Sequence, residues 1–442
     1  MTSKSLVSVG RSKKMLWPVV AFITILVSKF MFIKLFAVNV PFWDQWDGEA
    51  RDLLIPFAEG RLSFGDLFLQ HCEHTMFMTK LLSLILYRVT GKWDQLNIIY
   101  AQAVIHASAL LWIMICFRQQ LKRIPLVVNA SILLLFCLPI GYEHMLIGFG
   151  VSHLLLLFGT FAICMAAAET TIKNAILTSL GVLFSLLSTA GGISVPMICA
   201  IAFLIKAYTQ PNKKREIFMA ILMVLTIVIA RLLTVPFTGH DFLKANSLFA
   251  FLKSFIGIAG WPHSPLAGVF FWLPLTILLL QTAFYDFKVI LRKQKLLLLI
   301  GWIIILVAAA AYTRGRFGNR YADWLLLIVP ATAACFWTFT SSQSRWTKIY
   351  RSIFSAVVIT YATISLLTVI PEIREAHTNR HRMALSLIAA LQSEENKRGS
   401  GLALLKTKTP NVDLPHPSAE TVWAVITHPK FGSKIVLGDG QN

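Results

Sequence analysis

Ionisable side chains are concentrated in residues 42–80, a stretch that begins FWDQWDGEARD and ends QHCEHTMFMTK. Asp44 and Asp47 are three residues apart, so on a helical turn the two carboxylates face the same way. Two histidines, a glutamate and Lys80 follow in the same stretch. A carboxylate can take a proton from an attacking hydroxyl group, and a cation can stabilise an anionic leaving group. The spacing therefore predicts an acid–base site, with Asp44 or Asp47 as the general base.

The rest of the chain is strongly apolar. Of its 442 residues 56% are hydrophobic and only 14% are charged, and the mean hydropathy is +0.67. A soluble domain of this length does not carry so much apolar surface, so the sequence predicts an all-α polytopic membrane protein. Basic residues that set membrane topology and contact lipid headgroups explain the formal charge of +20. We expect a phospholipid bilayer around the protein and no nucleic-acid partner.

About eleven apolar segments are predicted to span the membrane. They are residues 15–37, 96–117, 127–139, 151–168, 175–189, 195–208, 217–235, 266–284, 296–311, 324–339 and 353–370. Segment 76–89 has only about 14 residues and contains Lys80 and Arg88, so we expect it to lie at the interface without crossing. Every strongly basic short loop then falls on one side. The loops with DQWD, HCEH, YEHM and TRGR fall on the other.

This topology divides the chain into three parts. Residues 1–14 form a cytoplasmic tail, residues 15–370 the membrane domain with a first outer loop at 38–95, and residues 371–442 a small outer tail. In the first loop we expect two short amphipathic helices, one at 46–58 and one after a capping-box pattern at Ser63 and Asp66. Further helices are expected at 249–258 and 372–392. Glu49 is expected to be a surface or capping residue.

Several polar residues are predicted on the same outer side as the first loop. The candidates for substrate binding are Glu73, His74, Lys80, Glu143, Arg231, Arg314, Arg320 and Tyr321. Outer arginines run against the positive-inside bias, and a guanidinium matches two phosphate oxygens at once. A phosphate head at the rim of the bilayer accounts for them. The structural alternatives are headgroup anchoring for the arginines and a solvated acid pair for Asp44 and Asp47.

Charged groups inside the apolar segments and the HCEH motif raise two further questions. Lys29 lies deep in the first span and needs a partner or a polar cavity, whereas His106 is expected to be a helix-packing histidine.

His71 and His74 invite a metal interpretation, but HExxH and a second ligand cluster at defined spacing are absent. We therefore predict no metal site and no cofactor, with a divalent metal as the alternative.

Together these residues predict transfer of a sugar from a polyprenyl-phosphate donor to an acceptor hydroxyl, with the leaving phosphate stabilised by arginine or lysine. The segments FWDQWD, EGRLSFGDLFLQHCEHTMF and LLSLILYRVTGKWD, with many spans and short juxtamembrane helices, resemble the plan of GT-C fold glycosyltransferases. Size and layout are similar to the serotype-converting O-antigen glucosyltransferases, which modify lipopolysaccharide. Where the motif of that group reads EHR this chain has EHT, so Thr75 replaces the arginine.

The resemblance, which covers residues 1–160 at the level of motifs, implies an undecaprenyl-phosphate glucose donor. It also implies an O-antigen or other lipid-linked glycan acceptor and a site on the periplasmic face of a bacterial inner membrane. The N-terminus would be cytoplasmic and the C-terminus periplasmic, with a flippase and a cytoplasmic-face donor synthase as further partners. Two alternatives remain. A flippase or transporter would place its charges at the membrane midplane. An O-antigen ligase or polymerase would move a whole glycan from a diphosphate carrier.

Overall fold

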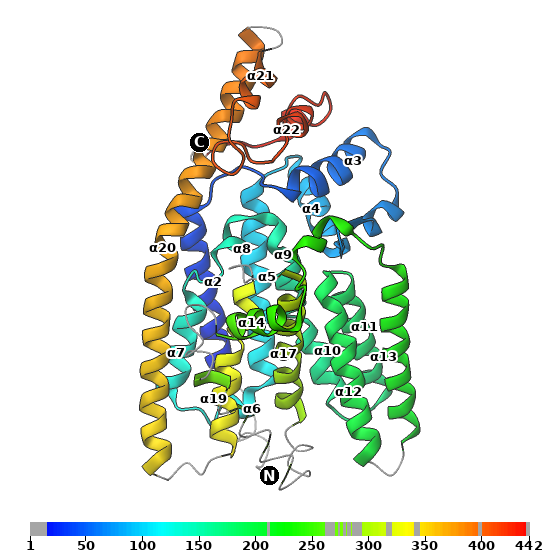
Figure 1. Ribbon diagram of the computed structural model, residues 1–442, viewed down its shortest axis with the longest axis vertical. Coiled ribbons are helices and arrows are strands. Elements are labelled where there is room, and N and C mark those ends of the chain that lie inside the picture. The colour runs from blue at the N-terminus through cyan, green and yellow to red at the C-terminus, as the bar shows by residue number, and fades with distance from the viewer. Residues whose placement is uncertain are drawn as a thin grey trace, which may run out of the picture.

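The computed structural model describes residues 16–209, 213–260, 270–272, 275–276, 280, 284, 294–314, 321–339, 345–396 and 400–438. These residues are almost entirely helical, and the strands among them are β1 (Gln70–His71) and β2 (His74–Thr75). Most long helices run along the long axis of the molecule in Figure 1. The first loop and the C-terminal segment lie together at the upper end, around α3, α4, α21 and α22.

Seven helical stretches are long and apolar enough to cross a membrane, which confirms the predicted all-α membrane character. They are α2 (Leu16–Phe36), α5 (Gln95–Cys116), Gly148–Ala166, Ala190–Thr209, α13 (Lys214–Leu233), α17 (Gln294–Arg314) and Ser352–Glu395. The third stretch comprises η3 (Gly148–Gly150), α9 (Val151–Leu156) and α10 (Gly159–Ala166), and the fourth comprises η4 (Ala190–Ile193) and α12 (Ser194–Thr209).

Three other predicted spans form shorter helices. They are α7 (Leu126–Cys137), α11 (Ile172–Leu186), and the pair α18 (Ala322–Leu325) and α19 (Ile328–Phe339). The 12 residues of α7 extend about 18 Å, against about 30 Å for the hydrocarbon core of a bilayer. The expected span 266–284 lies mostly outside the described residues. Seven of the eleven predicted spans therefore match a helix of spanning length.

Small residues let the apolar helices approach closely. A Cβ on Gly181 of α11 would lie 2.9 Å from the Cβ of Ala162 in α10, so the two helices touch at this point. Such contacts suit helices in an apolar medium, where packing and buried hydrogen bonds replace the hydrophobic effect. One such bond runs from the Trp302 indole of α17 to the Ser194 hydroxyl of α12 at 2.9 Å.

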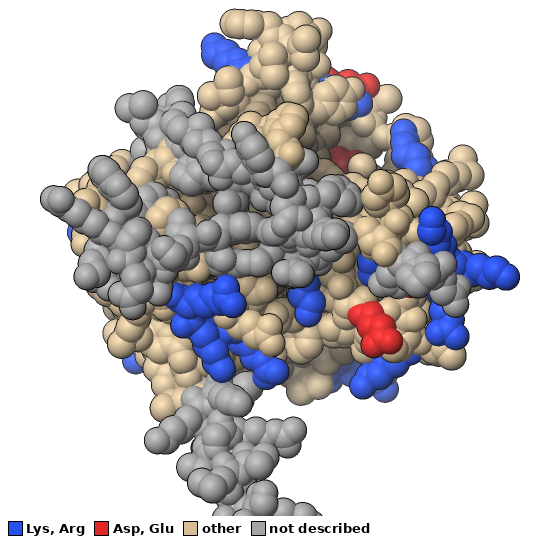
Figure 2. All heavy atoms as spheres, turned by 90° about the horizontal axis from the view of Figure 1, so that it is seen from below, with Lys and Arg blue, Asp and Glu red and all other residues tan. Residues whose placement is uncertain are grey.

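The lower end of the molecule is basic. Figure 2 shows Lys and Arg side chains gathered over this end. The loop around α6 (Arg118–Leu121), which follows α5, and the start of α13 carry exposed basic residues, namely Arg118, Lys122, Arg123, Lys213, Lys214 and Arg215. Figure 1 places α6 at the end opposite to α3 and α4. The basic loops and the HCEH loop are thus at opposite ends of the bundle, as the sequence predicts.

The first loop folds into short helices. A π-helix, η1 (Gln45–Leu54), continues into α3 (Ile55–Glu59), where one amphipathic helix was predicted. The predicted capping box is present at η2 (Phe64–Phe68), where the Ser63 backbone N donates to Asp66 Oδ2 at 2.7 Å. The next helix, α4 (Phe77–Thr90), is not among the spanning candidates. This agrees with the expectation that segment 76–89 does not cross.

The C-terminal segment differs from the sequence prediction. The helix expected at 372–392 is part of α20 (Arg345–Asn396), which continues from the last span through Pro371. It is followed by α21 (Gly401–Lys406), α22 (Ala419–Ile426) and η7 (Gly432–Lys434). These elements pack on the first loop through a shared apolar cluster, the first-loop core, which includes Trp46, Leu53, Leu54, Trp93, Leu387, Leu405, Val422 and Phe431.

Backbone hydrogen bonds also join the first loop to the C-terminal segment. Asn39 N donates to Gly438 O at 2.9 Å, and Trp93 N donates to the Lys434 carbonyl at 2.8 Å. Because apolar packing and backbone hydrogen bonds both join the two segments, the first loop and the C-terminal segment form one folded unit.

Candidate functional site

The HCEH motif forms a hairpin at the upper end of the bundle. His71 pairs with His74 across β1 and β2, so Cys72 and Glu73 occupy the turn between them. Cys72 has φ of 51°, in the left-handed region that two-residue hairpin turns require. The turn therefore projects a thiol and a carboxylate from adjacent positions. Burial raises the pKa of the Cys72 thiol to about 11, with the nearby Asp44 and Glu73 carboxylates adding to the shift.

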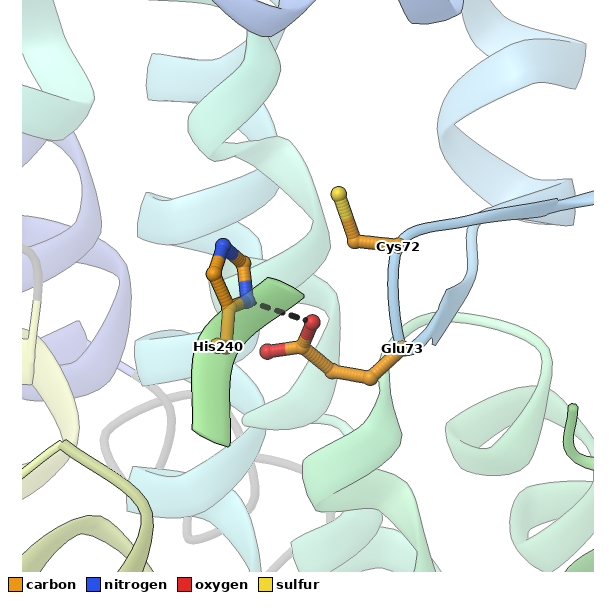
Figure 3. Close-up of side chains that lie close together, drawn as sticks. All are labelled: Cys72, Glu73 and His240. Carbon is orange, nitrogen blue, oxygen red and sulfur yellow. Dashed lines mark hydrogen bonds and ion pairs between the residues drawn. The ribbon is translucent and has the colours of Figure 1, made fainter. Parts of the chain in front are cut away.

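Glu73 joins three parts of the chain. Its Oε1 accepts from Arg314 at the end of α17, and its Oε2 lies 2.8 Å from Nδ1 of His240 in η5 (Thr238–Leu243), as Figure 3 shows for His240. His74 Nε2 lies 3.6 Å from Oε1. Burial opposes ionisation, but the charges of His74 and Arg314 and the hydrogen bond with His240 hold the pKa of Glu73 below its ordinary value. Glu73 is thus an ionised centre.

The two first-loop aspartates have different surroundings. The Asp44 side chain is 50% exposed, and its Oδ1 lies 3.7 Å from Nε2 of His71. Asp47 is bound on both oxygens, by Arg51 at 2.8 Å and by His416 at 2.9 Å. The hydrogen bond from His416 is the main reason that the pKa of Asp47 is lowered. Asp44 is therefore the aspartate that is more accessible to a reacting hydroxyl group.

His71 is held beside Asp44 by packing. Its ring lies 5.5 Å from the Phe149 ring, and a Cβ on Gly48 would lie 3.2 Å from His71 Nδ1. His71 Nε2, the atom that faces Asp44, is buried and has no hydrogen-bond partner in the described part of the chain. The Asp44 carboxylate is the acidic neighbour of this buried ring nitrogen.

Glu49 was expected to be a surface or capping residue, and this prediction is wrong. Its side chain is completely buried. It accepts hydrogen bonds from Gln45 at 2.9 Å, Ser83 at 2.8 Å and the Trp93 indole at 3.2 Å. Burial raises the pKa of Glu49, and these three hydrogen bonds oppose the shift. Glu49 therefore fixes η1 against α4 and the start of α5.

Lys80 holds the segment of the first loop that leads into the HCEH hairpin. The whole Lys80 residue is only 2% exposed. Its ammonium donates hydrogen bonds to the carbonyls of Asp66 at 3.1 Å and Leu69 at 2.8 Å. Burial lowers the pKa of Lys80. The ammonium is thus used by the loop itself, and its predicted contact with a substrate stays a prediction.

The remaining predicted residues differ in their link to the hairpin. His74 Nδ1 lies 3.3 Å from the Ala190 backbone N, which ties the hairpin to η4. Arg231 is exposed near the end of α13, and Val235 N just beyond it donates to Gln70 at 3.0 Å. Glu143 lies in α8 (Tyr142–Leu146), Tyr321 packs 5.7 Å from Trp324, and Arg320 lies outside the described residues.

A second group of ionisable side chains is buried within the bundle. Lys29 of α2 is 1% exposed and has Asp323 of α18 as its attracting carboxylate. Asp323 Oδ1 lies 3.5 Å from Nε2 of His106 in α5. Asp323, which no local pattern in the sequence marked, supplies the negative charge that offsets Lys29, while the Lys29 ammonium itself contacts Met145 Sδ at 3.9 Å. His106 contacts this carboxylate and is more than an apolar packing residue.

Two histidines of the upper site were missed because they are remote in sequence. His240 lies 167 positions from Glu73, and His416 lies 369 positions from Asp47. No spacing rule connects such pairs, and only the placement of each histidine in a polar loop hinted at a role. The comparisons add no assignment, because no family model, curated protein or solved structure matches this chain.

Proposed function

We propose that this protein is a membrane glycosyltransferase that moves a sugar from a polyprenyl-phosphate donor to the hydroxyl group of a glycan acceptor. One observation carries the proposal. The half-exposed Asp44 carboxylate lies beside the HCEH hairpin, whose Glu73 holds Arg314, at one end of an apolar helical bundle. A lipid-linked phosphate would present its head at such an end and keep its tail in the bilayer.

Asp44 is the better candidate for the general base. A base must reach the hydroxyl proton, and half of the Asp44 side chain is exposed. Asp47 is occupied by Arg51 and His416, which favours a role in holding η1. Asp44 would take the proton while the acceptor oxygen attacks the anomeric carbon of the sugar. The bond from that carbon to the phosphate oxygen breaks, and the polyprenyl phosphate leaves.

Arg314 is the candidate for holding the leaving phosphate. A guanidinium has five N–H donors, and the ion pair with Glu73 occupies only part of them. Glu73 would orient the guanidinium, as a carboxylate commonly orients a cation that binds an anion. The resemblance to O-antigen glucosyltransferases supports undecaprenyl-phosphate glucose as the donor, O-antigen as the acceptor and the periplasmic face of an inner membrane as the location.

The test measures sugar transfer from a radiolabelled polyprenyl-phosphate glucose by the purified protein. Asp44→Asn should lower kcat about 100-fold or more, because it removes the base and keeps the shape. Asp52→Asn is the matched control, since Asp52 is a partly exposed acid of η1, of which Asp44 is the N-cap, and is paired with Arg51; it should keep full activity. An Asp44→Asn enzyme of undiminished rate would overturn the assignment of the base. An added hexose branch on surface polysaccharide in cells would identify the class.

A transporter of lipid-linked glycans is the second candidate. The buried group of Lys29, His106 and Asp323 favours it, because transporters place ionisable residues inside the bundle. The candidate predicts that Asp323→Asn stops translocation of a fluorescent lipid-linked glycan in proteoliposomes while Asp44→Asn does not. Transfer without translocation in the same vesicles would reject it.

A further inference from the structure

Three ligand-type side chains converge at the tip of the HCEH hairpin. The Cys72 sulfur, a carboxylate oxygen of Glu73 and a ring nitrogen of His240 all lie within 4.8 Å of one another. Figure 3 shows the His240 ring directed at the Glu73 carboxylate, with the thiol projecting from the same turn. The three groups come from the hairpin and from η5, which lie far apart in the chain.

Both sides of this cluster are held in place. On the hairpin side, the turn fixes Cys72 in the left-handed conformation, which a non-glycine residue adopts only when its surroundings hold it there. On the other side, the His240 ring packs 4.9 Å from the Phe237 ring in an edge-on contact. The Val235–Gln70 hydrogen bond of 3.0 Å joins the two sides just before η5 begins. The convergence is therefore a product of several independent contacts.

We propose that Cys72, Glu73 and His240 form a binding site for one zinc ion. Thiolate, carboxylate and imidazole are the three donor types that zinc takes from proteins, whereas magnesium and calcium prefer oxygen ligands. Three protein ligands leave a fourth position for water or for a group of a substrate. This inference does not depend on glycosyl transfer, since it concerns the donor set alone.

The geometry requires a small closure. Ligand atoms on a tetrahedral zinc ion lie about 3.3–3.8 Å apart, given bonds of about 2.0–2.3 Å. In this structure the three ligand atoms lie within 4.8 Å of one another. A shift of about 1 Å in the thiol therefore completes the site. Zinc would replace the contact between His240 Nδ1 and Glu73 Oε2, and it would leave Oε1 on Arg314. Cys72 would lose its proton to solvent on binding, so charge and atoms balance.

Such a site would have a consequence for Arg314. Metal on Oε2 would withdraw negative charge from the carboxylate that neutralises the guanidinium. Arg314 would then attract an anion more strongly than it does in the metal-free protein. Zinc would thus hold η5 on the hairpin and leave a more strongly anion-attracting arginine beside it.

The experiment titrates the full-length, EDTA-stripped protein in detergent with zinc sulfate by calorimetry, and counts bound metal by elemental analysis after dialysis. We expect one zinc ion per chain, with affinity lowered about 10-fold or more in Cys72→Ser and in His240→Ala. Matched controls are Cys137→Ser and His428→Ala, which change the same residue types away from the cluster. These should bind as the parent does.

Cobalt provides a second readout that a folding defect cannot imitate. Cobalt bound by a thiolate gives a sulfur-to-metal charge-transfer absorption, expected in the parent and in Cys137→Ser and absent in Cys72→Ser. Size-exclusion profiles would verify that each variant is folded. Two outcomes overturn the proposal: failure of the folded parent to retain zinc, or retention that both cluster variants leave unchanged. Neither outcome concerns sugar transfer, which the Asp44 variants test separately.

Discussion

His416 donates a hydrogen bond from Nε2 to Oδ2 of Asp47 at 2.9 Å, although 369 positions separate the two residues. The Ser418 backbone N donates to His416 Nδ1 at 3.1 Å, so Nδ1 is the acceptor and the proton lies on Nε2. The C-terminal segment therefore contributes a specific polar contact to the first loop, in addition to the apolar packing of the first-loop core. Asp47 is held from its own helix by Arg51 and from the C-terminal segment by His416.

Replacement of His416 by alanine should loosen this contact. A hydrogen bond to a charged group contributes about 1.5–3 kcal/mol, and partial exposure of Asp47 reduces this to about 1 kcal/mol. The thermal midpoint in detergent should therefore fall by about 2 °C. His428→Ala is the control, because His428 makes a longer contact of 3.3 Å with Glu59 outside the site. Equal decreases in the thermal midpoint of both variants would mean that the His416–Asp47 contact stabilises the protein no more than the His428–Glu59 contact does.

The stability contributed by Asp47 should depend on pH with a defined sign. Folding lowers the pKa of this carboxyl below 3.8, chiefly through the hydrogen bond from His416, with the charge of Arg51 adding and burial opposing the shift. The folded state then binds fewer protons than the unfolded state. The stabilisation is complete above 3.8 and is lost as the pH falls through the folded-state pKa.

This effect is measured as the difference in thermal midpoint between the parent protein and Asp47→Asn. The difference should be constant between about pH 5 and 7 and should shrink at pH values below that range, as the carboxyl of the folded parent takes up its proton. A difference that grows on acidification would have the wrong sign and would contradict the lowered pKa.

Lys80→Met tests whether the buried ammonium holds the loop. The variant leaves the Asp66 and Leu69 carbonyls without their donor, at a cost of about 2 kcal/mol in unfolding free energy. We expect a lower thermal midpoint and faster proteolysis of residues 60–75. Lys92→Met changes an exposed lysine of the same loop and should be neutral. A Lys80→Met protein of full stability with a raised KM for the donor would assign Lys80 to the substrate instead.

Lys29 and Asp323 should show strong energetic coupling. Asp323→Asn removes the carboxylate whose charge offsets that of the buried Lys29 ammonium, and a buried charge left without compensation destabilises the folded state. Lys29→Met with Asp323→Asn removes both charges and should restore most of the lost stability. The four proteins of this cycle would be compared by thermal midpoint and by yield of monodisperse material. Additive losses in the double variant would argue against the pairing.

Local patterns in the sequence predicted part of the fold well. Apolar runs located the long helices α2, α5, α13 and α17 to within three residues at each end, because hydropathy is a local property. The Ser63–Asp66 capping box was predicted for the same reason, since its two residues are three positions apart. The short length of segment 76–89 likewise predicted a helix too short to be a spanning candidate, as α4 is.

Long-range contacts were not predictable from one sequence. Burial of Glu49 depends on Gln45, Ser83 and Trp93, and nothing in the local pattern of FWDQWDGEARD states that these donors will surround it. The same holds for His240 at Glu73 and for Asp323 at Lys29. The C-terminal segment was expected to be a small outer tail because it is polar overall, but apolar side chains such as Val422 and Phe431 pack against the first loop.

The pairing of Asn39 with Gly438 determines when the first loop can reach its final fold during synthesis. Ribosomes add about 5–20 residues per second, so roughly 400 residues separate the two partners by about 20–80 seconds. Throughout that interval the first loop lacks the surface that covers Trp46 and Leu53. A chain that stops early would therefore carry every helix of the membrane domain and still expose apolar side chains at its upper end. The residues around Gly438 and Phe431 thus decide whether the apolar side chains of the first loop are covered or exposed.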